Sequence, residues 1–340
     1  RNSHFKILMK QYGLMVGYKV IVVAGLLGIG GILVFDQAMN IGQFIAAEII
    51  ILLVVSSVDK LILSAETIYD VLTALEKIAQ VTDLEIEPED GIDAKQKLDS
   101  DGISVTLKDV SFRYRDQEED AVSNFNITVN ESEKVVITGV NGSGKTTLLN
   151  ILSGICRPSK GSVLYGNIPF VNLELESIRD LKGGYLDDEI IFEGTLLENI
   201  AMGRDIATLD NVAWATKKLG LTDFIHGLPQ GYNTMLDPLN QGLPRSIIQK
   251  ILLARAIVIR PKLLFLEEPL KHIDNEERNS IINFLLDKEN PWTLIAVSSL
   301  MHFVEKADRA LVIENGKLQS FERFRTSNNS LNLIGHVKHI

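Results

Sequence analysis

The stretch Gly139-Val-Asn-Gly-Ser-Gly-Lys-Thr-Thr147 decides how the rest of this sequence is interpreted. It fits the pattern G-x-x-x-x-G-K-[ST], whose glycines let backbone N–H groups converge on phosphate oxygens. The apolar run within residues 133–138 predicts a buried strand before the loop, and residues 146–155 have the pattern of a helix after it. The helix N-terminus adds a positive partial charge at the phosphate. The sequence therefore predicts an α/β P-loop nucleotide-binding domain.

Each residue of this loop has an expected role at a bound nucleotide. Lys145 is placed to reach the β- and γ-phosphates, and the Thr146 hydroxyl is placed to hold Mg²⁺. The expected nucleotide-binding residues of the loop are Gly139, Asn141, Gly142, Ser143, Gly144, Lys145, Thr146 and Thr147.

Composition sets limits on the partners of this chain and on its disulfide bonds. The chain has 340 residues, enough for about two domains, and a net charge of −10. An acidic protein lacks the basic surface that phosphate backbones need, so we expect no nucleic acid partner. A single cysteine, Cys156, excludes an intrachain disulfide. Because the chain begins with Arg1 rather than Met, we expect it to be a fragment or a processed product.

Two apolar runs predict membrane-spanning helices at about residues 13–35 and 41–58. Lys19 interrupts the first run and must reach its edge or face protein. Glu48 lies in the second run, where it either faces a substrate pathway or lies at the membrane boundary or beside a neighbouring helix; both interpretations stay open. Lys6, Lys10 and Lys19 lie before or near the start of the first span, Lys60 follows the second, and the turn has no Lys or Arg. This predicts cytoplasmic ends in a multi-pass plasma or inner membrane protein.

The remaining boundaries follow from changes in pattern. Residues 59–81 have amphipathic helical spacing, so we expect the second span to continue as a cytoplasmic helix and residues 1–81 to form a partial transmembrane domain. The charged segment 82–101, with Pro88 and Gly91, predicts a linker. Residues 102–324 are expected to form the nucleotide-binding domain, in which strands and helices alternate. The polar segment 325–340 predicts a loosely ordered tail.

A second chemical signal is the segment Leu263-Leu-Phe-Leu-Glu-Glu-Pro269, an apolar strand that ends in two carboxylates. Glu267 can hold Mg²⁺, and Glu268 can orient or deprotonate the attacking water. The alternative is an acidic strand–helix junction without a catalytic role. The phosphate-binding loop upstream favours the functional interpretation.

Further segments make the chain resemble the ATP-binding cassette (ABC) superfamily, specifically exporters with fused membrane and nucleotide-binding domains. These segments are Ile41-Gly-Gln-Phe44, Val110-Ser-Phe-Arg-Tyr114, Phe192-Glu-Gly-Thr-Leu-Leu-Glu-Asn-Ile200, Ile251-Leu-Leu-Ala-Arg-Ala-Ile257, Arg260-Pro-Lys262, Asp274 and Asp308-Arg-Ala-Leu-Val-Ile-Glu-Asn-Gly316. The resemblance implies ATP and Mg²⁺ as cofactors, Tyr114 as the ring that stacks on adenine, and Asp187 as a further metal ligand. It also implies that the two spans are the last two of six.

Four positions depart from the family pattern. Leu243-Pro-Arg-Ser-Ile247 stands where the family has L-S-G-G-Q, and Pro244 has no N–H for the γ-phosphate of an opposite subunit. Asp187 replaces a glutamine, Glu267 replaces an aspartate, and Ser299 replaces a histidine. The groups that bind the nucleotide are thus retained, whereas most groups that sense or cleave the γ-phosphate are altered. The resemblance therefore implies weak hydrolysis by this chain alone.

Several functions stay open. The preferred hypothesis is a subunit of an ATP-driven membrane exporter, paired with a second, different exporter subunit to give unequal sites; a homodimer is also possible. The alternative is a non-hydrolysing ATP-binding regulator or membrane scaffold. A soluble ATPase of the chromosome or DNA-repair type is disfavoured by the two apolar spans. Neither the runs nor the motifs identify the transported substrate.

Overall fold

The computed structural model describes residues 2–84, 86–87, 90–115, 117–186, 190–237 and 242–323. The chain divides into two compact units, Arg1–Ile86 and Glu87–Ile340. The polar segment 325–340 lies outside the described residues.

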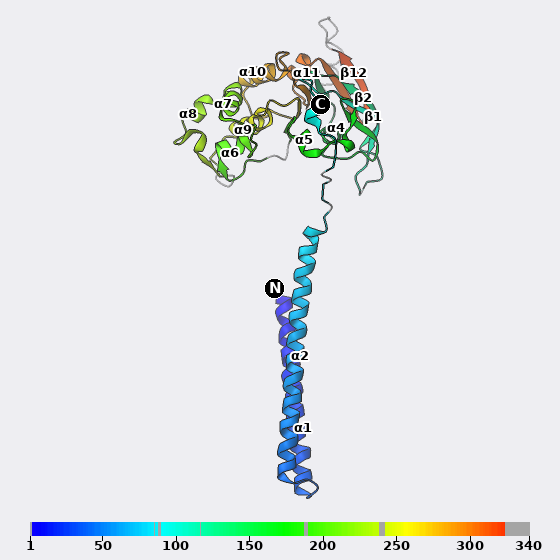
Figure 1. Ribbon diagram of the computed structural model, residues 1–340, viewed down its shortest axis with the longest axis vertical. Coiled ribbons are helices and arrows are strands. Elements are labelled where there is room, and N and C mark those ends of the chain that lie inside the picture. The colour runs from blue at the N-terminus through cyan, green and yellow to red at the C-terminus, as the bar shows by residue number, and fades with distance from the viewer. Residues whose placement is uncertain are drawn as a thin grey trace. The chain divides into compact units, whose positions relative to one another are not determined.

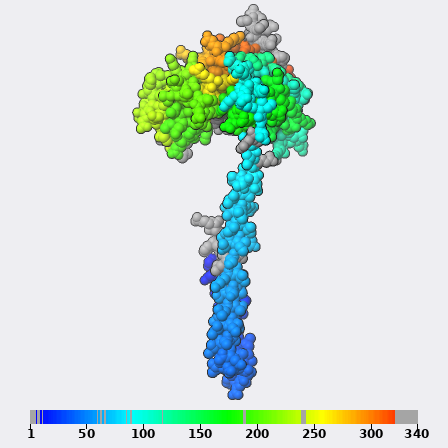
Figure 2. Space-filling view, viewed as in Figure 1, coloured from blue at the N-terminus to red at the C-terminus, as the bar shows by residue number. Residues whose placement is uncertain are grey.

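The first unit is a hairpin of two long helices, α1 (Asn2–Phe35) and α2 (Ile41–Thr82), which pack along each other (Figures 1 and 2). Asn40 starts α2 with a capping box, because its side chain accepts from Gln43 N at 2.7 Å while Gln43 Oε1 accepts from Asn40 N at 3.1 Å. The ring of Phe44 packs against Gly30, where a Cβ would lie 2.3 Å from a ring carbon. Glycine at this position lets the two helices approach closely.

Each helix of the hairpin holds a stretch long and apolar enough to cross a bilayer. These stretches are Tyr12–Phe35, with 24 residues, and Ile41–Val58, with 18 residues. Only 6% of either stretch is buried within the structure, so neither is the covered core helix of a soluble domain. The predicted helical hairpin is confirmed.

The second unit is an α/β domain around a six-stranded sheet of order β12-β11-β3-β10-β9-β6. Its strands are β3 (Lys134–Thr138), β6 (Lys182–Tyr185), β9 (Leu263–Glu267), β10 (Thr293–Val297), β11 (Arg309–Glu314) and β12 (Lys317–Arg323). All neighbours are parallel except β12, which pairs antiparallel with β11. The three central strands β3, β10 and β9 are buried along their whole length, which explains their continuous apolar runs.

A second, antiparallel sheet has the order β2-β1-β4-β5. Its strands are β1 (Val105–Phe112), β2 (Val122–Val129), β4 (Lys160–Tyr165) and β5 (Ile168–Pro169). Helix α4 (Lys145–Leu152), directly after the phosphate-binding loop, packs on β9 and β10. One hydrophobic core joins the two sheets and α4, with Phe125, Leu148 and Tyr165 among its fully buried side chains. The α/β P-loop class predicted from the sequence is confirmed.

A helical lobe lies to one side of the domain, away from β1 and β2 (Figure 1). It contains α6 (Leu196–Ala201), α7 (Leu209–Lys218), α8 (Thr222–His226), α9 (Arg245–Ile257), the short strands β7 (Gly194–Thr195) and β8 (Met235–Leu236), and a 3-10 turn at Gly231–Asn233. The remaining helices are α3 (Ala94–Lys97), α5 (Leu175–Arg179), α10 (Asn275–Leu286), α11 (Met301–Lys306) and the 3-10 turn Phe170–Asn172. A second core cluster joins this lobe to α10, α11 and the sheet.

The segment before β1 packs against the α/β domain. Ala94 is fully buried, its N–H donates to Ser177 Oγ at 2.9 Å, and Ile92 forms an isolated bridge with Leu173. The end of the segment expected to be a linker is therefore held by the domain that follows it.

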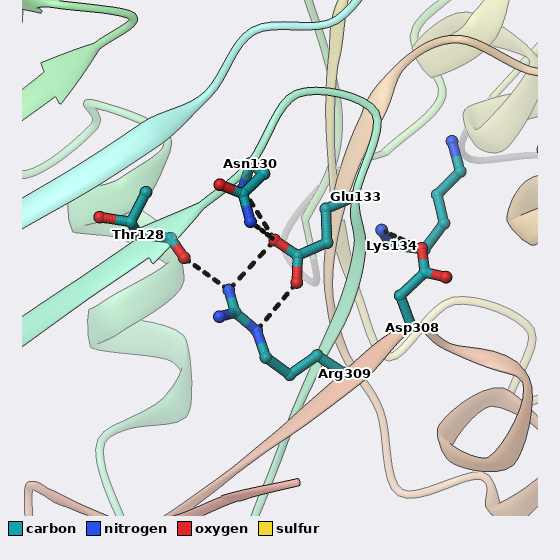
Figure 3. Close-up of polar contacts among 6 residues, drawn as sticks. All are labelled: Thr128, Asn130, Glu133, Lys134, Asp308 and Arg309. Carbon is teal, nitrogen blue, oxygen red and sulfur yellow. Dashed lines mark hydrogen bonds and ion pairs between the residues drawn. The ribbon is translucent and has the colours of Figure 1, made fainter. Parts of the chain in front are cut away.

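A buried ion pair joins Glu133, the residue before β3, to Arg309, the first residue of β11 (Figure 3). Arg309 Nε lies 3.0 Å from Glu133 Oε1, and its Nη2 donates to Thr128 O at 2.6 Å. Asn130 donates to the same carboxylate from its backbone N at 2.7 Å. The side chains of Arg309 and Glu133 are only 7% and 10% exposed. This pair therefore ties together the N-terminal ends of β3 and β11, opposite the end of β3 that leads into the phosphate-binding loop.

Candidate nucleotide-binding site

The loop between β3 and α4 requires glycine at two positions where the backbone is crowded. Gly139 has φ +148°, and a Cβ there would lie 2.1 Å from Ile313 O. Gly144 has φ +99°, and a Cβ there would lie 2.5 Å from Ala121 O. Any other residue would have to push these neighbours away as well as adopt a left-handed conformation. The loop therefore wraps tightly around the start of α4.

The side chain of Lys145 is hydrogen-bonded to the backbone of the loop. Its Nζ donates to Gly139 O at 2.9 Å and to Val140 O at 2.8 Å. Burial lowers the pKa of Lys145, and the nearby carboxylates of Glu268 and Glu267 oppose this effect. The Nζ atom thus lies against the backbone of the phosphate-binding loop.

The loop also contains a buried hydroxyl that fits a phosphate ligand. Ser143 is 2% exposed, and its Oγ has no hydrogen-bond partner in the part of the chain that the structure describes. Its carbonyl accepts from Gly316 N at 3.0 Å, which ties the loop to the turn between β11 and β12. A buried polar atom without a partner is costly, so a phosphate oxygen at the loop would remove that cost.

Two oxygen-bearing side chains meet at the start of α4. The Thr146 hydroxyl donates to Glu267 Oε1, and Glu267 is only 7% exposed at the end of β9. Both are oxygen ligands of the kind that Mg²⁺ takes together with nucleotide phosphates and water. Among the described residues there is no group of three or more His, Cys, Asp or Glu that could hold a metal. Asp187, the third expected ligand, lies outside the described residues.

Tyr114 follows β1 and reaches the same helix. Its hydroxyl lies 3.0 Å from Thr147 Oγ1, and Phe112 contacts its ring edge-on at 4.9 Å between centroids. The ring remains 40% exposed, so it offers a free face to a planar group. Thr147 itself is buried and links this aromatic ring to the phosphate-binding loop.

Glu268 is the first residue after β9 and has a left-handed backbone, with φ +41°. Its N–H donates to Val297 O at 2.8 Å, and its Oε2 accepts from Ser299 Oγ at 3.4 Å. The bent backbone directs this carboxylate into the same cavity as Lys145 and Glu267. Uncharged Ser299, which the resemblance aligned with a histidine, is thus hydrogen-bonded to Glu268.

These residues border one cavity of about 660 Å³, large enough for a nucleotide. The expected residues that line it are Tyr114, Asn141, Gly142, Gly144, Lys145, Thr146, Thr147, Glu267 and Glu268. Gly139 and Ser143, which were also expected at the site, are not among the residues that line this cavity. The lining residues that sequence reasoning did not assign are Gln117, Glu119, Asp120, Ala121, Lys271, Val297, Asn315 and Gly316. Asn315 and Gly316 reach the site because β11 pairs with β3, and local sequence carries no signal of that pairing.

The segment Leu243-Pro-Arg-Ser-Ile247, which the resemblance aligned with the family signature, lies on another element. Pro244 is the N-cap of α9, without a side-chain capping bond, and its carbonyl accepts from Ile247 N at 3.0 Å and Ile248 N at 3.1 Å. Arg245 is exposed on the first turn. Neither residue borders the cavity, so the segment plays no part in this chain's own phosphate-binding loop.

Comparison with known proteins identifies the family. Residues 122–271 match the family model of the ABC transporter. The chain is 27% identical over 308 residues to the alpha-hemolysin translocation ATP-binding protein HlyB of Escherichia coli, covering 91% of this chain and 43% of that protein. The chain belongs to the ABC transporter family. It is also 30% identical over 270 residues to ABC transporter B family member 29, chloroplastic, of Arabidopsis thaliana, covering 78% of this chain and 42% of the relative.

A solved structure shares the architecture of this ABC chain. It is a bacterial Atm1-family ABC exporter with ATP bound, with a TM-score of 0.74 and 23% identity, over 95% of this chain and 55% of the other. At that identity the likeness concerns the fold alone. The chain spans less than half the length of the two sequence relatives described above, 43% and 42%.

Proposed function

We propose that this chain is a subunit of an ABC exporter that binds Mg-ATP strongly and cleaves it weakly. The observation that carries the proposal is the cavity at the phosphate-binding loop, which joins Lys145, Thr146 and Glu267 at one end to Tyr114 at the other. The loop amides and Lys145 would hold the phosphates, the Tyr114 ring would stack on adenine, and Thr146 and Glu267 would hold Mg²⁺. The metal would supply charge neutralisation between the β- and γ-phosphates.

The groups that would act on the γ-phosphate support only slow cleavage. Glu268 is placed to orient or deprotonate water, but its side-chain neighbour Ser299 carries no positive charge. In a pair of subunits, the segment around Pro244 and Arg245 would face the partner's nucleotide, and a proline has no N–H to donate. The loss of one well-placed transition-state contact costs about 10²–10³ in rate. Several such losses favour a heterodimer, in which the other subunit supplies the intact groups.

The two apolar helices support a membrane location, with transport driven across the bilayer by the nucleotide cycle. One relative, HlyB of Escherichia coli, is an alpha-hemolysin translocation ATP-binding protein by name. The ABC domain would lie on the cytoplasmic side, because lysines flank the hairpin outside its turn. The transported substrate is not part of the proposal.

The test is nucleotide binding and phosphate release by the full chain in lipid nanodiscs. The chain alone should retain Mg-ATP at millimolar concentrations and release phosphate slowly, and Lys145→Ala should abolish retention. Glu268→Gln should leave retention intact and remove the residual release. Phosphate release at the rate of an ordinary exporter would defeat the unequal pair, and retention unaffected by Lys145→Ala would defeat the nucleotide site.

A second candidate is an ATP-binding regulator that never cleaves nucleotide. The observation that favours it is the uncharged Ser299 hydroxyl beside Glu268. In the assembled transporter, Glu268→Gln distinguishes the two. Transport should fall if Glu268 takes part in the cycle and should be unchanged if the subunit only binds ATP.

A further inference from the structure

The loop after β9 brings a lysine to the phosphate end of the cavity, and neither the sequence motifs nor the proposed function gives it a role. Lys271 lines the cavity together with Lys145, Thr146, Glu267 and Glu268. It is exposed, and its side chain forms no ion pair or hydrogen bond with any other residue that the structure describes. Lys271 therefore has a charge available for a ligand in the cavity.

The backbone on either side of Lys271 is fixed. On one side, Leu270 is 1% exposed and adopts a left-handed conformation with φ +77°. On the other side, the N–H of His272 donates to Gln249 Oε1 at 3.0 Å, and Ile273 is buried. A leucine in this conformation is strained, and such strain persists only where the surrounding structure enforces it. The turn thus holds the backbone of Lys271 in place at the cavity that its side chain lines.

More carboxylates than lysines line the part of this cavity that the structure describes. Four carboxylates line it (Glu119, Asp120, Glu267 and Glu268), but Lys145 and Lys271 are its only lysines among the described residues. Asp120 is paired with Arg113 at 2.7 Å, and Glu267 accepts from Thr146. Glu268 accepts a hydrogen bond from the neutral Ser299 hydroxyl, and Lys145 is the nearby cation of the loop. A γ-phosphate entering beside Glu268 would meet a like charge, and Lys271 adds a second positive charge to that of Lys145.

We infer that Lys271 binds the γ-phosphate of the nucleotide and supplies the positive charge that Ser299 does not. The inference rests on the proposed nucleotide site and adds a residue that discriminates a triphosphate from a diphosphate. Lys145 sits within the loop and reaches the β-phosphate that both nucleotides have as well as the γ-phosphate, whereas Lys271 lines the cavity from the loop after β9. Loss of Lys271 therefore weakens ATP binding and leaves ADP binding unchanged.

The experiment compares Mg-ATP and Mg-ADP affinities of the full chain in nanodiscs by calorimetric titration. Lys271→Met keeps the length of the side chain and removes the charge. It should weaken ATP binding about tenfold to a hundredfold, as expected for a hydrogen bond to a charged group, with ADP affinity within twofold of the unsubstituted chain. Lys271→Arg should keep the preference for ATP. Lys217→Met removes an exposed charge on α7, outside the cavity, and should change neither affinity.

The outcomes separate this inference from the proposed function. Equal losses of ATP and ADP affinity in Lys271→Met, or no loss of either, would overturn the role of Lys271. Lys145→Ala serves as the reference, because it should remove both nucleotides. If Lys145→Ala removes both while Lys271→Met leaves the ATP-to-ADP ratio intact, the nucleotide site stands and the inference about Lys271 is wrong.

Discussion

The hydrogen bond between Tyr114 and Thr147 gives a direct test of how the adenine end of the site is built. Its oxygens lie 3.0 Å apart, and Phe112 supports the ring edge-on at 4.9 Å. The bond holds the ring in place before nucleotide arrives. In Tyr114→Phe the ring is free to move, so its ordering has to occur on binding and weakens the affinity for ATP. Immobilising a side chain costs about 0.5–1.5 kcal/mol, which is a loss of about twofold to tenfold in ATP affinity.

Replacement of the whole ring should cost more. Tyr114→Ala removes the face on which a base would stack, and base–aromatic stacking contributes about 1–3 kcal/mol. We therefore expect about a fivefold to 150-fold weaker affinity for ATP. The loss should be nearly the same for GTP, because every base presents a π-face to the ring.

A double-mutant cycle identifies the bond itself. Thr147→Val keeps the shape of the side chain and removes its hydroxyl, so it should reproduce the loss of Tyr114→Phe. The double variant should be no weaker than either single variant, since the same bond is removed once. Fluorescent ATP titration of the full chain in nanodiscs measures all four affinities. A gain in affinity for Tyr114→Phe would refute the reasoning, because it would mean that Tyr114 competes with the phosphate for the Thr147 hydroxyl.

Other perturbations address the loop, the sheet and pH. Gly144→Ala places a Cβ 2.5 Å from Ala121 O at a left-handed position, so the same titration should detect at least a tenfold loss of ATP affinity while circular dichroism stays unchanged. Glu133→Gln leaves Arg309 without its buried carboxylate and should lower the free energy of unfolding by about 3–5 kcal/mol in urea titrations; an unchanged midpoint would contradict this. Burial lowers the pKa of Lys134 from 10.5 to about 8, so the folded state loses its proton first. Stability should therefore rise from pH 8 to 10.5, by up to about 1.4 kcal/mol per unit, and Lys134→Met should remove that rise.

Local sequence patterns predict the parts of the fold that depend on neighbours in the chain. The apolar run before Gly139 and the helical spacing after Lys145 correspond to β3 and α4, because a buried parallel strand and an amphipathic helix differ in period. The order of the sheet strands has no such local signal. β11 lies beside β3 although more than 150 residues separate them, and this pairing places the Asn315–Gly316 turn against the phosphate-binding loop.

The same limit applies to the site. The loop residues and the two carboxylates at the end of β9 can be recognised from their motifs, since each motif lies within a few residues. Lys271 could not be found in this way, because its place in the cavity depends on the left-handed turn at Leu270 and on the bond from His272 N to Gln249. The bond between Tyr114 and Thr147 likewise joins two segments 33 residues apart. Spacing in the sequence does not determine which side chains meet across a fold.

The positions of the residues that depart from the family pattern are compatible with the proposed combination of firm binding and weak cleavage in one folded domain. At Gly139 and Gly144, a larger residue meets backbone atoms at 2.1 and 2.5 Å, so a change there disturbs the loop itself. Ser299 and Arg245 are exposed, and neither contributes to the buried core. Substitution at these two positions changes the charge and the donors presented to a γ-phosphate without leaving a cavity in the core. The loop glycines and the two exposed positions thus differ in what a substitution changes: the loop itself in one case, and the charge and donors offered to a γ-phosphate in the other. Nucleotide retention and phosphate release therefore have to be measured separately.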